Sequence, residues 1–334
     1  MRGSSIALLL AAAATAPLAC FAQGGDAASE QRAPALAPLG VGPLHMASHA
    51  DLDVEKITID VTLDAVVATY ALRNKGRAPL DLAASVALPG LQAFAEDGQP
   101  WNLPAATPEN PVALSVAADG APVAAKADVK AYALGVDRRP EIEAARLPLL
   151  PFGPRTAQAL AALGPKALGE LSALGIVSPR DPDHPDRPVV ADWTLAVVYS
   201  WRQPLPAGKT TTIIVKYAPL KAETRYGPAD ALDVEDIKDE ACLTQAQLAA
   251  AQDRLKSAGS ALAVTEIALV NEPVLRWFDS PTASVSVRKP GPDAIVAFCG
   301  MDAPAADQPV VRGAEFGGAD PRDFRILIIE PTTK

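Results

Sequence analysis

Histidines and recognisable catalytic motifs are scarce in this sequence. It contains three histidines, and it has no GxSxG, HExxH or GxGxxG pattern. This excludes the usual serine hydrolase, zinc protease and dinucleotide-binding signatures. Gly208-Lys209-Thr210 resembles the end of a phosphate-binding loop, but Gln203 stands where that loop needs its first glycine and a β-like run follows. We expect a hairpin turn there, no cofactor, and a protein that is not an enzyme.

The three histidines do not form a persuasive metal site. His45 and His49 are four residues apart, as ligands on a helix would be, but they precede a predicted strand and border a linker, which favours a solvated segment. His184 lies in DPDHPDRP, where the prolines and the missing distal glutamate do not suit a calcium loop. We therefore expect no bound metal.

Positive charge is also in deficit. Lys and Arg number 30 against 39 acidic residues, for a net charge of −9. A polyanion would be repelled rather than bound by clustered cations, which argues against nucleic acid and against an anionic membrane surface as partners. After the amino terminus no apolar run approaches the roughly 20 residues of a transmembrane helix, so no span is expected.

The amino terminus has the composition of a secretory signal peptide over residues 1–22. Arg2 precedes an apolar run that ends with small residues at Cys20 and Ala22, which suits cleavage before Gln23. A lipoprotein anchored through Cys20 is the alternative, although Pro17-Leu18-Ala19 lacks the usual order of residues for lipidation. The chain is therefore predicted to work in the periplasm or outside the cell.

Cysteine use fits an oxidising compartment. With Cys20 in the signal, the mature chain keeps Cys242 and Cys299, and two such cysteines usually pair. A disulfide across these 57 residue steps would contribute about 4 kcal/mol in the chain-entropy model. Two separate buried thiols are the alternative.

Strand-like alternation dominates the mature chain. Residues 23–44, rich in Ala, Pro and Gly, predict a flexible leader. Apolar and polar residues then alternate over 56–63, 66–72 and 80–88, which predicts a three-stranded antiparallel meander. Asp119-Gly120 predicts a tight hairpin. Further strands are expected over 191–203, 209–218, 262–270, 283–287, 294–298 and 324–329.

Two helical regions interrupt the strands. Leucines at helical spacing predict an insertion of short helices at about 139–176, and a further helix is predicted at about 239–258 with Cys242 in its first turn. The predicted fold is mainly β, with antiparallel sandwich-like sheets. Residues 45–334 form one β-rich domain or two sub-domains.

An aromatic stripe is the strongest candidate for ligand binding. Trp193, Tyr199 and Trp201 fall on one face of a predicted strand. They could line an apolar groove, but large aromatic residues also dominate sandwich cores, and the core is favoured. Among functions, the preferred hypothesis is a non-enzymatic binding or interaction module of the cell envelope, with an envelope protein or a small ligand as partner. The alternative is an envelope hydrolase that uses carboxylates within 181–186 or 233–240.

Several segments together resemble a family of exported bacterial proteins. They include residues 46–91, DGAPVAAKADVKAYALGVD at 119–137, the strands within 193–219, DEAC at 239–242 and AFCG at 297–300. In this order they resemble domain of unknown function 4424. The resemblance implies a β-rich envelope protein whose two mature cysteines pair, and it implies no activity. The family pattern has an acidic residue near His49, which argues against a shared ligand role for that histidine.

Overall fold

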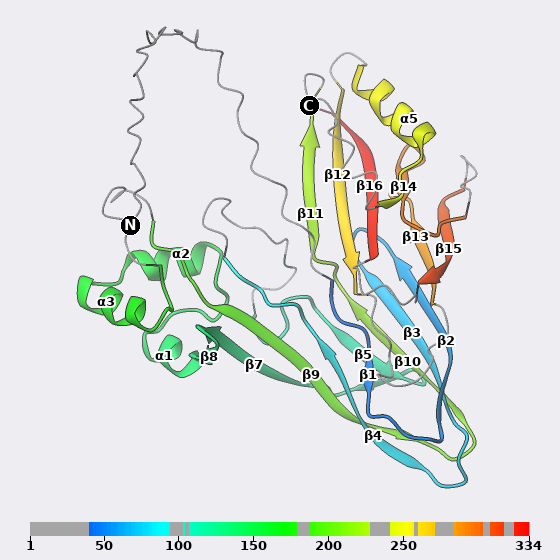
Figure 1. The fold of residues 1–334 in the computed structure, drawn as a ribbon, viewed down its shortest axis with the longest axis horizontal. Helices are drawn as coiled ribbons and strands as arrows, with labels where there is room; N and C mark the ends of the chain where they lie inside the picture. The colour runs from blue at the N-terminus through cyan, green and yellow to red at the C-terminus, as the bar shows by residue number, and fades with distance from the viewer. Residues whose placement is uncertain are drawn as a thin grey trace, which may run out of the picture. The chain divides into compact units, whose positions relative to one another are not determined.

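The computed structural model describes residues 40–93, 103, 107–178, 188–227, 241–256, 260–270, 283–302, 308–316 and 324–333. Within these residues the protein is mainly β, with three sheets and four short helices, which confirms the predicted fold class. Residues Pro34–Lys334 form one compact unit. Figure 1 shows its strands and helices.

The seven-stranded sheet has the order β15-β13-β2-β3-β10-β5-β6. The alternating segments at 56–63 and 66–72 form an antiparallel hairpin, as predicted, and their apolar residues face the core. The predicted Asp119-Gly120 turn is also confirmed, since both residues adopt positive φ (48° and 81°) between β5 and β6. The strands are β2 (Leu52–Val61), β3 (Val66–Asn74), β5 (Ser115–Ala118), β6 (Ala121–Val123), β10 (Thr210–Tyr217), β13 (Ala283–Arg288) and β15 (Val310–Phe316).

The five-stranded sheet has the order β1-β4-β9-β7-β8. It corrects two predictions. The third strand of the predicted meander, β4, pairs with β9 and β1 instead of β3. The turn at Gly208-Lys209-Thr210 is likewise not a hairpin, because β9 and β10 lie in different sheets. The strands are β1 (His45–Met46), β4 (Leu80–Ala87), β7 (Lys126–Ala133), β8 (Val136–Asp137) and β9 (Thr194–Leu205).

Asn74 explains why the chain changes sheets at these two turns. Its side chain is fully buried at the end of β3. Nδ2 donates to the carbonyl oxygens of Ala78 and Leu205 at 2.9 and 3.0 Å, and Oδ1 accepts from the Gly76 amide at 2.9 Å. These bonds satisfy backbone groups of the β3–β4 connection and of the end of β9. The Asn74 side chain therefore holds the β3–β4 connection to the β9–β10 connection, the two places where the chain passes from one sheet to the other.

One large core lies between the sheets. Buried side chains from all three sheets form a single cluster. Val41 and Leu44, at the end of the predicted leader, belong to this cluster and are 3% and 0% exposed. The folded part therefore begins before residue 45. The Leu44 amide donates to the Tyr70 hydroxyl at 3.2 Å, which fixes this entry segment to β3.

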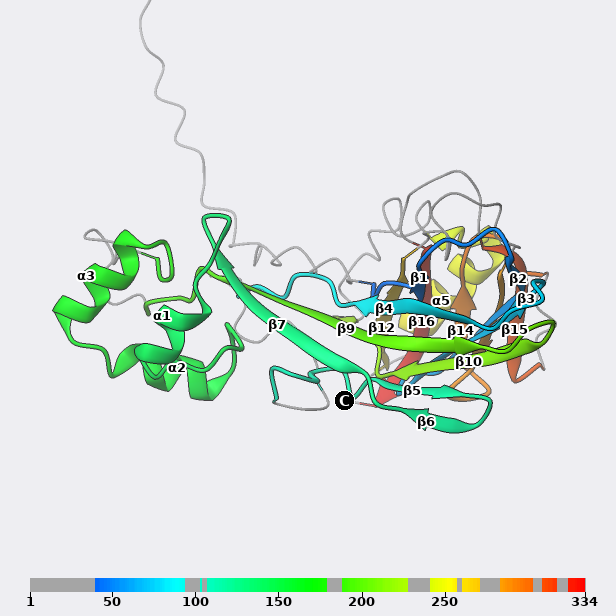
Figure 2. The ribbon, with the colours of Figure 1, turned by 90° about the horizontal axis from the view of Figure 1, so that it is seen from below.

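The helical insertion is present where the leucine spacing predicts it. It contains α1 (Arg139–Ala144), α2 (Pro154–Ala161) and α3 (Pro165–Ala173), each with a proline in its first turn. Figure 2 shows these helices beyond one end of β7 and β9. The Asp192 amide, just before β9, donates to the Ile176 carbonyl oxygen at 2.9 Å, so the insertion is bonded to the start of that strand.

The four-stranded sheet has the order β11-β12-β16-β14, and α5 (Gln245–Lys256) packs on β12. One face of this sheet joins the large core, and the other face forms a second apolar cluster with α5. The predicted strands at 262–270, 294–298 and 324–329 are confirmed. The strands are β11 (Lys221–Tyr226), β12 (Ser260–Leu269), β14 (Ile295–Ala297) and β16 (Phe324–Thr333).

Helix α5 begins later than predicted, and Cys242 precedes it instead of lying in its first turn. The cause is a capping box. The Gln247 amide donates to Thr244 Oγ1 at 3.2 Å, and the Thr244 amide donates to Gln247 Oε1 at 3.0 Å. Cys242 has a positive φ of 51°, which is incompatible with a regular helical turn.

Candidate functional site

The aromatic stripe lies in the core. Trp193, Tyr199 and Trp201 are 1%, 3% and 7% exposed, and all three belong to the large cluster. Each polar atom has an internal partner. Trp193 Nε1 donates to the Leu149 carbonyl oxygen at 2.8 Å, Trp201 Nε1 to Gln203 Oε1 at 3.0 Å, and the Tyr199 hydroxyl to Asn110 Oδ1 at 3.0 Å. These side chains fill the interior, where an approaching ligand would not reach them, and the Trp193 bond to Leu149 also ties the helical insertion to the start of β9.

Core burial also changes the acidity of the tyrosines. Desolvation raises the pKa of Tyr199, and the negative charge of Glu109 raises it further. Desolvation raises the pKa of Tyr70 to about 12, and the hydrogen bond from Leu44 opposes this rise. Both phenols are therefore neutral at physiological pH, where they act as hydrogen-bonding groups and not as bases.

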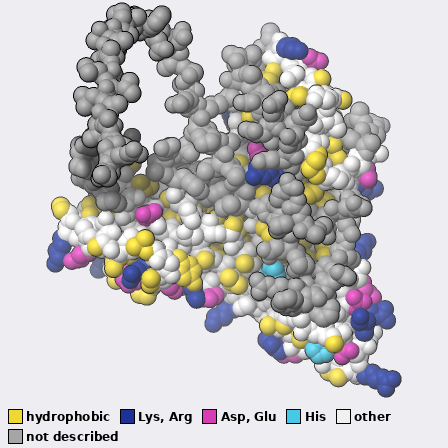
Figure 3. All heavy atoms as spheres, in the orientation of Figure 1, with side chains coloured by type: hydrophobic (Ala, Val, Ile, Leu, Met, Phe, Trp, Pro, Cys, Tyr) yellow, Lys and Arg dark blue, Asp and Glu magenta, His cyan; other side chains and the backbone are white. Residues whose placement is uncertain are grey.

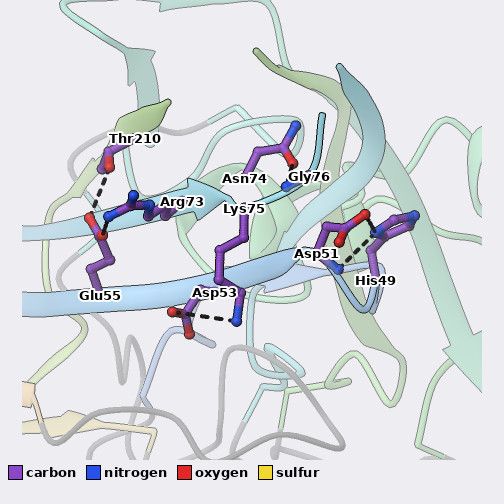
Figure 4. Close-up of polar contacts among 9 residues, drawn as sticks. All are labelled: His49, Asp51, Asp53, Glu55, Arg73, Asn74, Lys75, Gly76 and Thr210. Carbon is purple, nitrogen blue, oxygen red and sulfur yellow. Dashed lines mark hydrogen bonds and ion pairs between the residues drawn. The ribbon is translucent and has the colours of Figure 1, made fainter. Parts of the chain in front are cut away.

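The histidines gather no metal site in the described part of the chain. His49 Nδ1 accepts from the Asp51 amide at 3.2 Å and lies 3.8 Å from an Asp51 carboxylate oxygen (Figure 4). Across the described ranges, no group of three or more His, Cys, Asp or Glu side chains could hold a metal ion. His184 and the carboxylates at 181–186 and 233–240 lie outside the described residues, so the hydrolase hypothesis has no geometry to support it.

A row of ion pairs crosses the ends of β2, β3 and β10 (Figure 4). Glu55, placed at a β-bulge, bonds Arg73 at 3.2 Å and Thr210 at 2.9 Å, and Asp53 lies 3.7 Å from the Lys75 ammonium. All four charged side chains are about a third or more exposed, and such pairs contribute little stability. They form a solvated, charge-balanced surface and not a ligand site.

The exposed apolar residues are concentrated on strands of the five-stranded sheet. Among the described residues the exposed large hydrophobic side chains are Leu134, Val136 and Val198, at 79%, 47% and 39%. Two of them, Leu134 and Val136, belong to the hairpin tip, defined here as Leu134 and Gly135 of the β7–β8 turn together with Val136, the first residue of β8. Figure 3 shows hydrophobic side chains gathered over the helical insertion and the adjoining ends of β7 and β9.

The hairpin tip has an unusual residue for its backbone. Leu134 and Gly135 adopt φ of 49° and 76°, nearly the values of Asp119 and Gly120 in the other tight hairpin. This turn geometry favours Asn, Asp or Gly, and a leucine in the left-handed region costs about 1–2 kcal/mol. Leu134 touches Gly175, where an added Cβ would approach its Cγ to 2.5 Å, but most of the side chain faces solvent.

Comparison with known protein families shows to which family the chain belongs. A family model for a domain of unknown function, DUF4424, matches residues 35–312. The chain belongs to the DUF4424 family. This confirms the resemblance seen in the sequence. No curated protein matches the chain.

Solved structures offer only distant likenesses to this DUF4424 protein. A "putative nutrient binding protein" from Legionella pneumophila has 8% identity and a TM-score of 0.38, with 87% of this chain and 71% of that chain covered. Yeast LTA4 hydrolase has 9% identity and a TM-score of 0.27, with 84% and 29% covered. An M1 zinc metallopeptidase from Deinococcus radiodurans has 12% identity and a TM-score of 0.23, with 84% and 42% covered. At these scores none supports an inference about function.

Two further features of the DUF4424 chain concern the compartment and the membrane. Cys242 and Cys299 are joined by a disulfide over a sequence separation of 57, and this bond is consistent with an oxidising compartment. Within the described ranges, each helix is too short or too polar to cross a lipid bilayer.

Sequence reasoning missed the hairpin tip. Catalytic and binding motifs consist mostly of titratable and aromatic residues, and ALGVD at 133–137 has neither until Asp137. A usable signal was present, because a leucine directly before a glycine between two strand-like runs is unusual for a two-residue turn.

Proposed function

We propose that this DUF4424 protein is exported and acts as a non-enzymatic interaction module of the cell envelope. Export is supported by the charged and apolar amino terminus and by the disulfide between Cys242 and Cys299. A binding role is supported by the hairpin tip, which keeps an exposed leucine at a position where a polar residue would cost less. A protein of the envelope is the proposed partner, since an apolar tip of this size suits a pocket on another protein.

Export is tested by recovering the protein from the envelope fraction of its own cell and measuring its intact mass. The proposal expects a chain that begins at Gln23 and carries no free thiol. A chain that begins at a diacylated Cys20 would instead show a lipid-anchored form. Recovery of full-length protein with Met1 and three free thiols in the cytoplasmic fraction would contradict export.

The binding surface is tested by site-specific photo-crosslinking in envelope extract. A photoreactive residue replaces Val136 in the hairpin tip, and a control probe replaces Ala121, which is exposed in the similar β5–β6 hairpin. We expect a discrete adduct from the first probe only. The adduct should disappear with Leu134→Asn, because asparagine tolerates the positive φ while removing the apolar contact.

The same experiment contains its own folding control. Leu134→Asn should leave the unfolding midpoint unchanged or slightly higher, so loss of the adduct cannot be ascribed to unfolding. Asp119→Asn in the matched turn should leave the adduct intact. Equal adducts from both probes, or an adduct that survives Leu134→Asn, would rule out the hairpin tip as the binding surface.

A further inference from the structure

Residues 241–256, here called the strap, pack on one face of the four-stranded sheet, against β12, and are tied to the segment that contains its edge strand. The edge strand is β14, which pairs with β16 on one side. Three ties join the strap to residues 293–299, which include β14 (Ile295–Ala297). They are the disulfide from Cys242 to Cys299, the bond from Gln247 Nε2 to the Val296 carbonyl oxygen at 2.9 Å, and the bond from Arg254 Nη1 to the Asp293 carbonyl oxygen.

The three ties have a regular spacing. Residues 293, 296 and 299 are tied to strap residues 254, 247 and 242 respectively, so the strap runs antiparallel to the segment that contains β14. An edge strand presents unpaired backbone groups that can recruit another chain, and covering such an edge is a common solution. The strap therefore covers the β14 edge at Val296 and is anchored beyond each end of that strand, at Asp293 and Cys299.

The strap packs on a core of its own. Ala241, Leu243, Ala251 and Leu255 are buried in the second apolar cluster, which is separate from the large core between the sheets. The helix of the strap has 12 residues, a length that is marginal without external support. Its two polar ties are single hydrogen bonds, so the disulfide is the strongest constraint on its position.

The two residues of the disulfide differ from the neighbours of Cys242 in their exposure to solvent. Cys242 is exposed, while its neighbours Ala241 and Leu243 are buried. A non-glycine residue with φ of 51° also stores local strain. Thiol–disulfide exchange needs a reachable sulfur, and the exposure of Cys242 makes it the half of the disulfide on which we base the proposed attack.

We propose that the strap is a redox-sensitive closure of the β14 edge. A thiolate of a dithiol reductant attacks Cys242 Sγ, the disulfide breaks, and Cys299 leaves as a thiolate that takes up a proton. The second thiol of the reductant resolves the mixed disulfide, so two cysteine thiols form and the reductant becomes a disulfide. The strap then opens as a local unit, and the large core stays folded because it shares no cluster with the strap.

Hydrogen exchange on the intact exported protein tests this closure, with and without dithiothreitol. Reduction should lower the protection of peptides within 245–256 by about a thousandfold, as expected for loss of a loop constraint of this length. Peptides from β2, β3 and β10 should keep their protection. Cys242→Ser/Cys299→Ser without reductant should reproduce the reduced pattern, and Gln247→Ala with the disulfide intact should not.

Each other outcome overturns the proposal. A strap that stays protected after reduction is held by its packing alone. Loss of protection in all sheets, or failure of the double serine variant to fold, means that the disulfide supports the whole domain. A disulfide that resists dithiothreitol under native conditions is not a switch. None of these outcomes bears on the hairpin tip.

Discussion

Asn74→Ala tests the corner at which the chain changes sheets. The substitution removes three hydrogen bonds, to the carbonyl oxygens of Ala78 and Leu205 and from the Gly76 amide. Each such bond contributes about 0.5–1.5 kcal/mol, and a buried group left without a partner costs about 1–3 kcal/mol. We therefore expect the free energy of unfolding to fall by about 3–4 kcal/mol.

Thr62→Ala is the matched control. Thr62 also makes three hydrogen bonds in a turn, donating to the Ala65 carbonyl oxygen and accepting from the amides of Asp64 and Ala65. Its turn lies within one hairpin and is part-exposed, so water can replace the lost partners. We expect a loss of about 1 kcal/mol or less.

Urea unfolding followed by tryptophan fluorescence suits both variants, because Trp193 and Trp201 report on the large core. Circular dichroism of the folded variants shows whether the sheets are retained. If Asn74→Ala destabilises the protein no more than Thr62→Ala does, the two connections are not held by Asn74, and the explanation for the change of sheet fails.

Two further predictions concern buried groups. Because burial raises the pKa of Tyr70 from 10.0 to about 12, the stabilisation that the neutral, buried phenol contributes is complete below pH 10. About 3 kcal/mol of the free energy of unfolding is lost as the pH rises from 10 to about 12. Urea midpoints at pH 9 and 11 should differ less in Tyr70→Phe than in the wild type. Gly313→Ala should destabilise by about 1–3 kcal/mol, because a Cβ would lie 2.5 Å from the Phe298 ring. Gly291→Ala, with nothing within 4 Å, should be neutral in thermal unfolding.

Local patterns predicted most of the elements. Alternation at 56–63 gives β2 because a strand with one buried face must repeat every two residues, and Ile57, Ile59 and Val61 are all buried. Asp119-Gly120 predicts its turn because both residues tolerate positive φ. Strand β15 escaped prediction, because the short run VVRGAEF contains a glycine and two charged residues.

The sequence patterns predicted less well which strands pair with one another. The alternation of apolar and polar residues in 80–88 does not distinguish pairing of β4 with β3 from pairing with β9, since both arrangements bury one face of β4. The choice depends on Asn74, whose bonds to Leu205 join residues 131 positions apart. The helix start was missed for a related reason, because the acidic residues before Cys242 resemble a first turn while the cap lies at Thr244.

The sequence by itself determined the fold class, the family and the candidate disulfide pair Cys242 and Cys299, because composition, period and motif order are local properties of the chain. The tertiary structure decided what those residues do. It placed the aromatic stripe in the core, since strand alternation defines a face but not what covers it. It also left Leu134 exposed on a strained turn and brought Cys242 to the β14 edge, because contacts between distant segments depend on how all three sheets pack.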